Sequence, residues 1–155
     1  VTLYPNGTGL GYLVCENPID IIRYGMARIR PLTIYAHVKR LHDFIDFYKP
    51  AIIVLRDNSE EGVRMSNRVR KTIEAFEEQA KDNDLPVYKY SRADIKDVFS
   101  EFGKTTKYGI SKTISTWYPE LASRMPNMRR NQDAEHYQMG IFDVFALMLT
   151  HHYIE

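Results

Sequence analysis

An unbroken apolar run near the middle of the chain is the feature that most constrains its fold. Residues 51–55, Ala-Ile-Ile-Val-Leu, have the length of a strand and contain no polar residue. A strand with one solvated face alternates apolar and polar residues, so a continuous run indicates a strand that is covered on both faces of a sheet. The chain is therefore expected to build a sheet flanked by helices.

The segments before this run predict an antiparallel meander. Residues 1–4 predict a short strand that ends in the turn 5–9, whose Asn-Gly pair is a strong hairpin signal. Residues 11–15 then predict a second strand that pairs back on the first, and residues 20–29 predict a third. Three consecutive strands with such short connections are expected to be antiparallel.

Helical patterns alternate with strands in the remainder of the chain. Residues 32–48 and 59–81 carry apolar residues at the spacing of one helical face, and residues 86–90 predict a fifth strand. Further helices are expected at 91–102, with Ser91 as N-cap, Asp94 in the first turn and Gly103 at the end, at 110–121 and at 133–152. The prediction is one α/β domain over residues 1–155, with a mixed five-stranded sheet in which three antiparallel strands are followed by parallel ones.

Composition limits the cellular context. Cys15 is the only cysteine among the 155 residues, which excludes an internal disulfide and favours a reducing compartment. No apolar run approaches the roughly 20 residues that span a bilayer, and the start of the chain lacks the pattern of a secretory signal peptide. These features predict a cytoplasmic protein with no membrane segment.

Charge is balanced overall but unevenly distributed. The net charge is +1, yet residues 86–132 hold nine Lys and Arg against four Asp and Glu, and residues 133–155 hold four carboxylates and no Lys or Arg. A basic segment next to an acidic one is typical of metal-dependent enzymes of nucleic acids, because cations meet phosphates and carboxylates hold metal. On charge alone, a solvated helical face remains the more common explanation.

Four short motifs stand in order along the chain. They are Leu3-Tyr-Pro-Asn-Gly-Thr-Gly-Leu-Gly-Tyr12, Pro50-Ala-Ile-Ile-Val-Leu-Arg56, Leu85-Pro-Val-Tyr-Lys-Tyr90 followed after its helix by Lys107, and Phe142-Asp-Val-Phe-Ala-Leu-Met-Leu-Thr-His-His152. They resemble the first hairpin, the strand that ends in Glu, the segment with a lysine near the active site, and the closing helix of RuvC-type Holliday junction resolvases. The resemblance covers nearly the whole chain and implies an RNase H-like fold.

The resemblance also implies a particular metal chemistry. The family cuts DNA with two Mg²⁺ ions about 3.5–4 Å apart, which are held by carboxylates at the ends of two strands and by two Asp one turn apart on the last helix. The matching positions here are Tyr4, Arg56, Gly140 and Asp143. A tyrosine hydroxyl, with an ordinary pKa of about 10, is a poor metal bridge, and an arginine repels Mg²⁺. One carboxylate out of four is not expected to hold two metal ions.

Neighbouring residues offer partial substitutes. Asp57 follows Arg56 directly, and a β-bulge would turn it into the site, although a helix N-cap or an ion pair with Arg56 explains it more simply. His136 lies two helical turns before Asp143, near Glu135, so His136 and Asp143 are candidate ligands for one metal ion. A satisfied polar helix end is the simpler interpretation there. The cofactor is expected to be Mg²⁺ or Mn²⁺ if the site is active, and otherwise none.

Two cations carry specific predictions. The resemblance implies that Lys107 contacts the scissile phosphate. We expect Arg56 to pair with Asp143 and to replace the positive charge of the ions. Any catalytic role would fall on Asp143, Lys107 and Asp57. The candidate nucleic-acid-binding residues are Lys104, Lys107, Tyr108, Lys112, Arg129 and Arg130, of which Tyr108 could stack on a base.

Three functions remain open at this point. The leading hypothesis is a RuvC-like protein that binds branched or duplex DNA and whose endonuclease activity is lost or weakened. The second is an active Mg²⁺- or Mn²⁺-dependent endonuclease with a rearranged site. The third is a structural or protein-interaction module that has no role with nucleic acid. A homodimer is expected under all three, because the resolvases it resembles act as dimers on two-fold junctions.

Overall fold

The computed structural model describes residues 1–59, 64–126 and 137–155, and its centre is a five-stranded sheet. The strands are β1 (Thr2–Pro5), β2 (Leu10–Cys15), β3 (Ile21–Ala27), β4 (Ile53–Arg56) and β5 (Val87–Tyr90). Their order is β3-β2-β1-β4-β5, with β2 antiparallel to both β1 and β3, and with β4 parallel to both β1 and β5. The predicted mixed sheet is confirmed.

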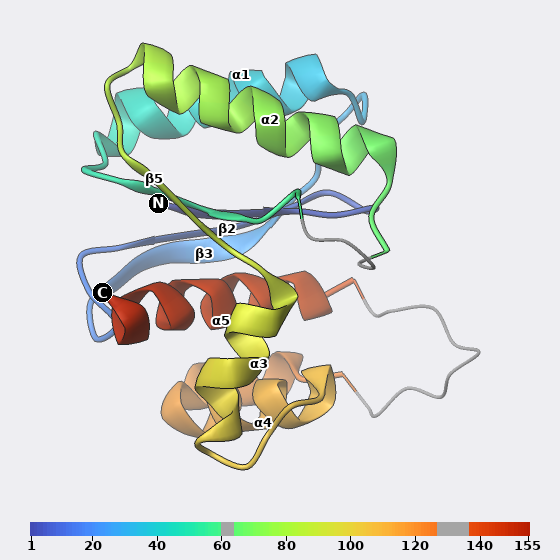
Figure 1. Cartoon of the computed structure of the whole chain (residues 1–155), viewed down its shortest axis with the longest axis vertical. Helices are drawn as coiled ribbons and strands as arrows, with labels where there is room; N and C mark the ends of the chain where they lie inside the picture. The colour runs from blue at the N-terminus through green and yellow to red at the C-terminus, as the bar shows by residue number, and fades with distance from the viewer. Residues whose placement is uncertain (60–63, 127–136) are drawn as a thin grey trace.

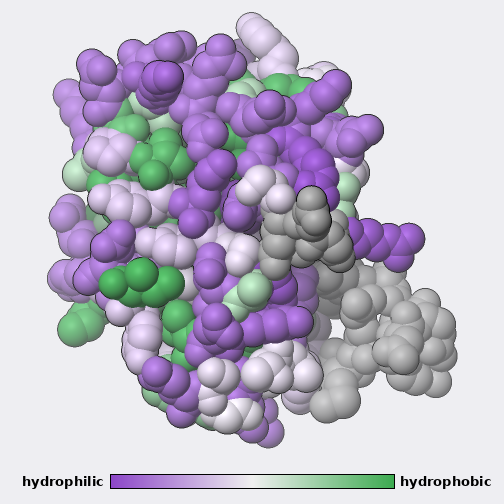
Figure 2. Space-filling model, viewed as in Figure 1, coloured by the Kyte–Doolittle hydropathy of each residue, from purple (hydrophilic) through white to green (hydrophobic). Residues whose placement is uncertain are grey.

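Helices cover both faces of this sheet (Figure 1). On one face lie α1 (Ile34–Tyr48) and α2 (Asn67–Asp82). On the other lies α5 (Met139–Ile154), with α3 (Arg92–Ser100), α4 (Lys107–Trp117) and the short 3₁₀ helix η1 (Pro119–Arg124) packed outside it. Figure 2 shows that the surface of the α2 layer is mainly hydrophilic, as its polar sequence predicts.

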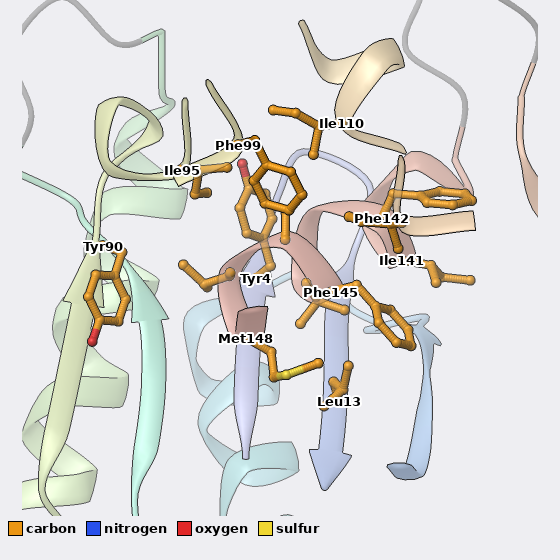
Figure 3. Packing of buried hydrophobic residues seen from close by; sticks show 14 of the residues in the cluster. Tyr4, Leu13, Tyr90, Ile95, Phe99, Ile110, Ile141, Phe142, Phe145 and Met148 are labelled. Carbon is orange, nitrogen blue, oxygen red and sulfur yellow. The ribbon is translucent and has the colours of Figure 1, made fainter. Parts of the chain in front are cut away.

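The alternation of side chains along the central strands creates two separate cores. Leu3 of β1 and Leu55 of β4 belong to the core under α1 and α2, whereas the neighbouring Tyr4 and Val54 belong to the core under α5. Figure 3 shows the second core, in which Tyr4 and other large side chains gather around α5. Residues 53–55 of the apolar run are therefore buried on alternating faces of the sheet, as predicted, whereas Ala51 is exposed and Ile52 is half-buried before β4 begins.

Helix α5 is the most enclosed element among the described residues. Apart from Leu149, every residue from Met139 to His151 is buried, because the sheet covers one side of the helix and α3 and α4 cover the other. The ring centroid of Phe145, for example, lies 5.2 Å from that of Tyr24 and 4.9 Å from that of Tyr118. A helix with apolar residues on every side is typically buried in the protein, as α5 is.

Several helix ends follow the predicted capping chemistry. Ser91 and Asp94 form a reciprocal capping box at the start of α3. Gly103 lies just beyond α3 with φ of 74°, a left-handed conformation that glycine adopts without strain. The cap of α4 was not predicted: Thr106 accepts a hydrogen bond from the amide of Gly109, so the helix begins at Lys107 rather than at residue 110.

Other predicted boundaries are wrong. Helix α2 begins at Asn67 rather than at residue 59, because Ser66 and not an earlier residue accepts the amide hydrogen bond of Val69. Residues 137 and 138 form a turn, so α5 begins at Met139, and the first part of the predicted helix 133–152 lies outside the described residues. The predicted helix 110–121 ends at Trp117, and Leu121 belongs to η1 instead.

Two aromatic side chains beside α3 and α4 are half exposed. Phe102 is 47% exposed and Trp117 is 43% exposed, and their rings pack against each other with centroids 5.0 Å apart.

Within the described residues, no helix is both long enough and apolar enough to cross a membrane.

Acid should destabilise the fold through His37, which is fully buried on α1. Its Nδ1 donates to the Thr33 carbonyl at 2.7 Å; burial lowers the pKa of His37, and the charge of Arg68 lowers it further. The unfolded chain then binds the proton first, so stability is fully present above the unfolded pKa of about 6.5 and is lost as pH falls through it.

We expect the free energy of unfolding, measured by urea denaturation between pH 7.5 and 5.5, to fall with acid. The His37→Gln variant should show a shallower fall, because its side chain stays neutral at every pH. His42→Gln, on the half-exposed face of the same helix, is the matched control. Equal pH slopes for wild type and His37→Gln would contradict the assignment.

Candidate functional site

A cavity of about 400 Å³ lies where the parallel strands β1 and β4 end. The side chains around it come from β1, β4, α2, α4 and α5, from the turn after β1 and from the segment just before α2. They include Tyr4, Arg56, Arg64, Ser66, Lys107 and Asp143. Three of the four positions that the resolvase resemblance singled out therefore line one cavity, together with the predicted lysine, and the fourth, Gly140, lies on the first turn of α5.

Tyr4 and Arg56 lie side by side because of the strand register. Leu3 is paired with Leu55, so the next residues of β1 and β4 both face α5. The Arg56 guanidinium carbon lies 4.2 Å from the centroid of the Tyr4 ring, and Nη1 donates to the Pro5 carbonyl at 2.8 Å. This cation–π contact and this hydrogen bond hold a positive charge at the end of β4.

Asp143 is the buried acid of the cavity. Its side chain is 5% exposed, and its Oδ2 lies 3.5 Å from Nζ of Lys107, which is 33% exposed. A buried carboxylate is costly without a cation beside it. Lys107, the first residue of α4, meets that need.

The predicted partner of Arg56 is therefore wrong. We expected Arg56 to pair with Asp143. In the structure Asp143 pairs with Lys107, and Arg56 contacts Pro5 and Tyr4 instead. The positive charge stays at the position that the resemblance matches to a metal ligand. It is held by a carbonyl and an aromatic ring instead of by a carboxylate.

Tyr4 presents a neutral hydroxyl to this cavity. Burial raises the pKa of Tyr4, and the Asp143 carboxylate raises it further, against the opposing effects of Arg56 and Lys107. The phenol therefore stays protonated at neutral pH. A neutral phenol does not replace the anionic oxygen that bridges two hard cations.

A carboxylate at Gly140 would require the Met26 side chain to move. A Cβ at this position would lie 2.8 Å from Cε of Met26, still closer to its sulfur, and 3.2 Å from Nδ2 of Asn6. The Met26 side chain reaches from β3 into the place where a larger side chain would stand. The carbonyl of Gly140 also lies 2.8 Å from where a Cβ of Gly11 would be, so α5 and β2 approach each other backbone to backbone.

Asp57 does not join the cavity, which corrects the prediction of a rearranged site. Arg56 is paired with Tyr90 in regular register, so no bulge turns Asp57 toward α5. Its Oδ1 accepts hydrogen bonds from the amide and the hydroxyl of Ser59, at 2.9 and 2.7 Å. Burial alone would raise the pKa of Asp57, but these bonds and the nearby Lys89 hold it below its ordinary value. Asp57 thus closes a turn, and it neither caps α2 nor pairs with Arg56.

The donor set does not fit a pair of Mg²⁺ or Mn²⁺ ions. At the four positions stand a neutral phenol, a guanidinium, a glycine and a single carboxylate. Among the residues that the structure describes, no three His, Cys, Asp or Glu side chains are grouped to hold a metal ion. His136 lies outside the described residues, so its predicted role as a ligand stays a prediction.

The predicted nucleic-acid-binding residues divide by position. Lys107 lines the cavity, whereas Lys104 and Lys112 are exposed and Tyr108 is half-buried. Five residues separate Lys107 from Lys112, which places their side chains roughly 140° apart around α4, and Lys112 does not line the cavity. Arg129 and Arg130 lie outside the described residues.

Two contributors escaped the sequence analysis. Arg64 lines the cavity just before α2, but no motif marks it. Met26 fills the place beside Gly140, and nothing in the pattern of β3 indicates contact with a helix more than 100 residues later. Both positions follow from tertiary packing.

Comparison with known proteins agrees with this architecture. No protein-family model matches the chain, and no curated protein matches it. The structure of Thermus thermophilus RuvC is similar with a TM-score of 0.62 and 14% identity over 97% of this chain and 91% of that chain. T. thermophilus RuvC in complex with a Holliday junction substrate is similar with a TM-score of 0.65 and 15% identity over 98% of this chain and 91% of that chain.

The order of strands, with helices on both faces of a mixed sheet, defines an α/β fold of the RNase H-like class. Within that class the fold is RuvC-like, and the resemblance noted in the sequence is confirmed at the level of the fold. Identity of 14–15% establishes the fold alone.

The packing of Met26 against Gly140 can be tested with a double-mutant cycle. Gly→Ala inside a helix usually stabilises a protein by about 0.5–1 kcal/mol. Here the new methyl displaces the end of Met26, so we expect Gly140→Ala to destabilise by about 1 kcal/mol.

In a Met26→Ala background, the same change should stabilise the protein by about 0.5 kcal/mol. The measurement is the free energy of unfolding of the four proteins in urea. Additive effects of the two substitutions would show that Met26 does not occupy this space.

Proposed function

We propose that this chain is a RuvC-like protein that binds branched or duplex DNA and whose endonuclease activity is lost or severely weakened. The observation that carries the proposal is the Arg56 guanidinium stacked on Tyr4 at the ends of β1 and β4. In the family that the sequence resembles, these are the positions of metal-binding carboxylates. A cation and a neutral ring take both of them here.

The loss of cleavage follows from charge. Two-metal hydrolysis needs anionic oxygens that hold both ions and stabilise the attacking and leaving groups. Asp143 alone supplies one such carboxylate, and Lys107 already contacts it at 3.5 Å. A divalent ion entering the cavity would have to compete with that ammonium and would meet the charge of Arg56.

DNA binding is supported by the cations that remain. Arg56, Arg64 and Lys107 line the cavity, and Lys104 is exposed just before α4. The similarity to T. thermophilus RuvC in complex with a Holliday junction makes a branched duplex the first ligand to test. A homodimer belongs to the same proposal, because a two-fold junction presents two equivalent sites.

The central experiment incubates the protein with a four-way DNA junction and with linear duplex, each with and without Mn²⁺. We expect binding by gel shift in both conditions and no strand cleavage on denaturing gels, because the donor set does not hold two ions. Binding should weaken steeply as salt rises, since phosphate contacts release counterions.

Mn²⁺-dependent cleavage that Asp143→Asn abolishes would instead support the active, rearranged site. Absence of binding to either DNA, or binding that is insensitive to salt, would reject the proposal and favour an interaction module.

A single lysine gives a sharper test of the DNA contact. We expect Lys107→Gln to weaken binding to every DNA tested and to reduce the slope of log affinity against log salt by about 1, as the loss of one phosphate contact does. Lys39→Gln, an exposed lysine on α1 across the sheet, is the charge-matched control. An unchanged salt slope for Lys107→Gln would place the DNA elsewhere on the surface.

A further inference from the structure

We propose that the cavity at the ends of β1 and β4 binds a phosphate group directly, with protein cations in the place of metal ions. The inference rests on the proposed function, since the phosphate would be one of the nucleic-acid backbone. It goes further because it names the binding site and the groups that recognise the ligand, and because it requires no divalent ion.

The lining of the cavity carries an excess of positive charge. The charged side chains that line the cavity within the described residues are Arg56, Arg64, Lys107 and Asp143. Three positive charges against one negative charge leave a net charge of +2 around about 400 Å³. Walls of low dielectric strengthen the attraction of such a cavity for an anion. A site that evolved for divalent cations would have the opposite sign.

The Arg56 guanidinium is already oriented for binding an anion. The Arg56 guanidinium is held in place by the Pro5 carbonyl at 2.8 Å and by the Tyr4 ring at 4.2 Å. A guanidinium has five N–H donors, and the bond to Pro5 uses one of them. Its planar fork matches two oxygens of a phosphate, and little side-chain entropy is left to lose on binding.

The start of α2 adds donors on the other side of the cavity. Ser66, the N-cap, and Val69 both line the cavity, and α2 extends over 16 residues. The Ser66 hydroxyl accepts the amide hydrogen bond of Val69 at 3.2 Å. The other amides of the first turn lack partners within the helix, as in any α-helix, and the positive end of the helix dipole favours an anion there.

Asp143 and Lys107 have a defined part in this arrangement. The carboxylate is buried and fixes the ammonium at 3.5 Å, at the edge of the cavity, where the lysine remains one-third exposed. The acid that would coordinate metal in a nuclease thus acts as a positioning residue for a phosphate-binding cation.

The experiment measures binding of inorganic phosphate to the full chain in EDTA, by isothermal titration calorimetry and by thermal unfolding, with chloride at equal ionic strength as the reference. We expect saturable binding in wild type. Arg56→Gln and Arg64→Gln should each weaken it about tenfold, the effect of losing one charge-assisted contact. Arg56→Lys should restore only part of the affinity, because it keeps the charge but loses the fork.

Arg23→Gln, an exposed arginine on the edge strand β3, is the matched control and should leave phosphate binding unchanged. Arg64 is exposed, so Arg64→Gln is expected to fold. It keeps the test decisive even if Arg56→Gln does not fold. A deoxynucleoside monophosphate and a four-way junction are then tested as competitors. Stronger competition by the junction would identify the backbone of DNA as the source of the phosphate.

The inference is overturned if phosphate binding does not saturate, if it requires Mg²⁺, or if Arg56→Gln and Arg64→Gln bind as wild type does. The outcome is separable from that of the proposed function. A protein that binds the junction with full affinity in both variants would retain the proposed function and lose this site. A protein that binds phosphate but no DNA would retain the site and lose the proposed function.

Discussion

The enclosure of α5 is the constraint on which the rest of the structure depends. The helix lies between the sheet and the pair α3 and α4, and nearly all of it is removed from water. A carboxylate on such a helix cannot remain ionised without a cation. Placing Lys107 at the first position of α4 meets that requirement. The packing of the helices and the electrostatics of the cavity are therefore parts of one arrangement.

The three positions that depart from the resolvase pattern form a consistent set. Arg56 lies over the Tyr4 ring, so the cation and the ring stabilise each other. Met26 occupies the place beside Gly140, so the missing side chain leaves no cavity there. Each replacement has a physical complement in the structure. Such mutual fit is what a protein would show if it had kept its fold while losing a metal site.

Much of the fold could be predicted because local chemistry determines it. Residues 53–55 of the apolar run are buried on both faces of the sheet, and the capping box of Ser91 and Asp94 starts α3. The wrong predictions arose where two local signals compete, or where the result depends on which face of the sheet a side chain takes. Residue 59 and Ser66 are both serines that suit a helix N-cap, and only the structure shows which one caps α2. Asp57 directly follows Arg56, whose strand pairing is regular, so the two side chains point to opposite faces of the sheet. Their adjacency in the sequence does not indicate this separation.

The site was predictable to a similar extent. The motifs brought Tyr4, Arg56, Gly140 and Asp143 to one end of the sheet, because their place in the chain fixes which strand or helix end they occupy. The pairing within the cavity was not predictable, since charge alone does not distinguish Lys107 from Arg56 as the partner of Asp143. The contribution of Met26 depends on how closely α5 approaches the sheet, which no local pattern encodes.

The position of Met26 has a consequence for the history of such a protein. It stands on β3, a strand that carries none of the four positions matched to the resolvase ligands, yet its side chain packs against one of them. To hold paired ions, the chain would need acids at Tyr4, Arg56 and Gly140 and a smaller residue at Met26. Any one of these changes made alone removes a stabilising contact and adds no catalysis. Selection for cleavage would find no improving first step, so a centre of paired ions is hard to acquire from this arrangement.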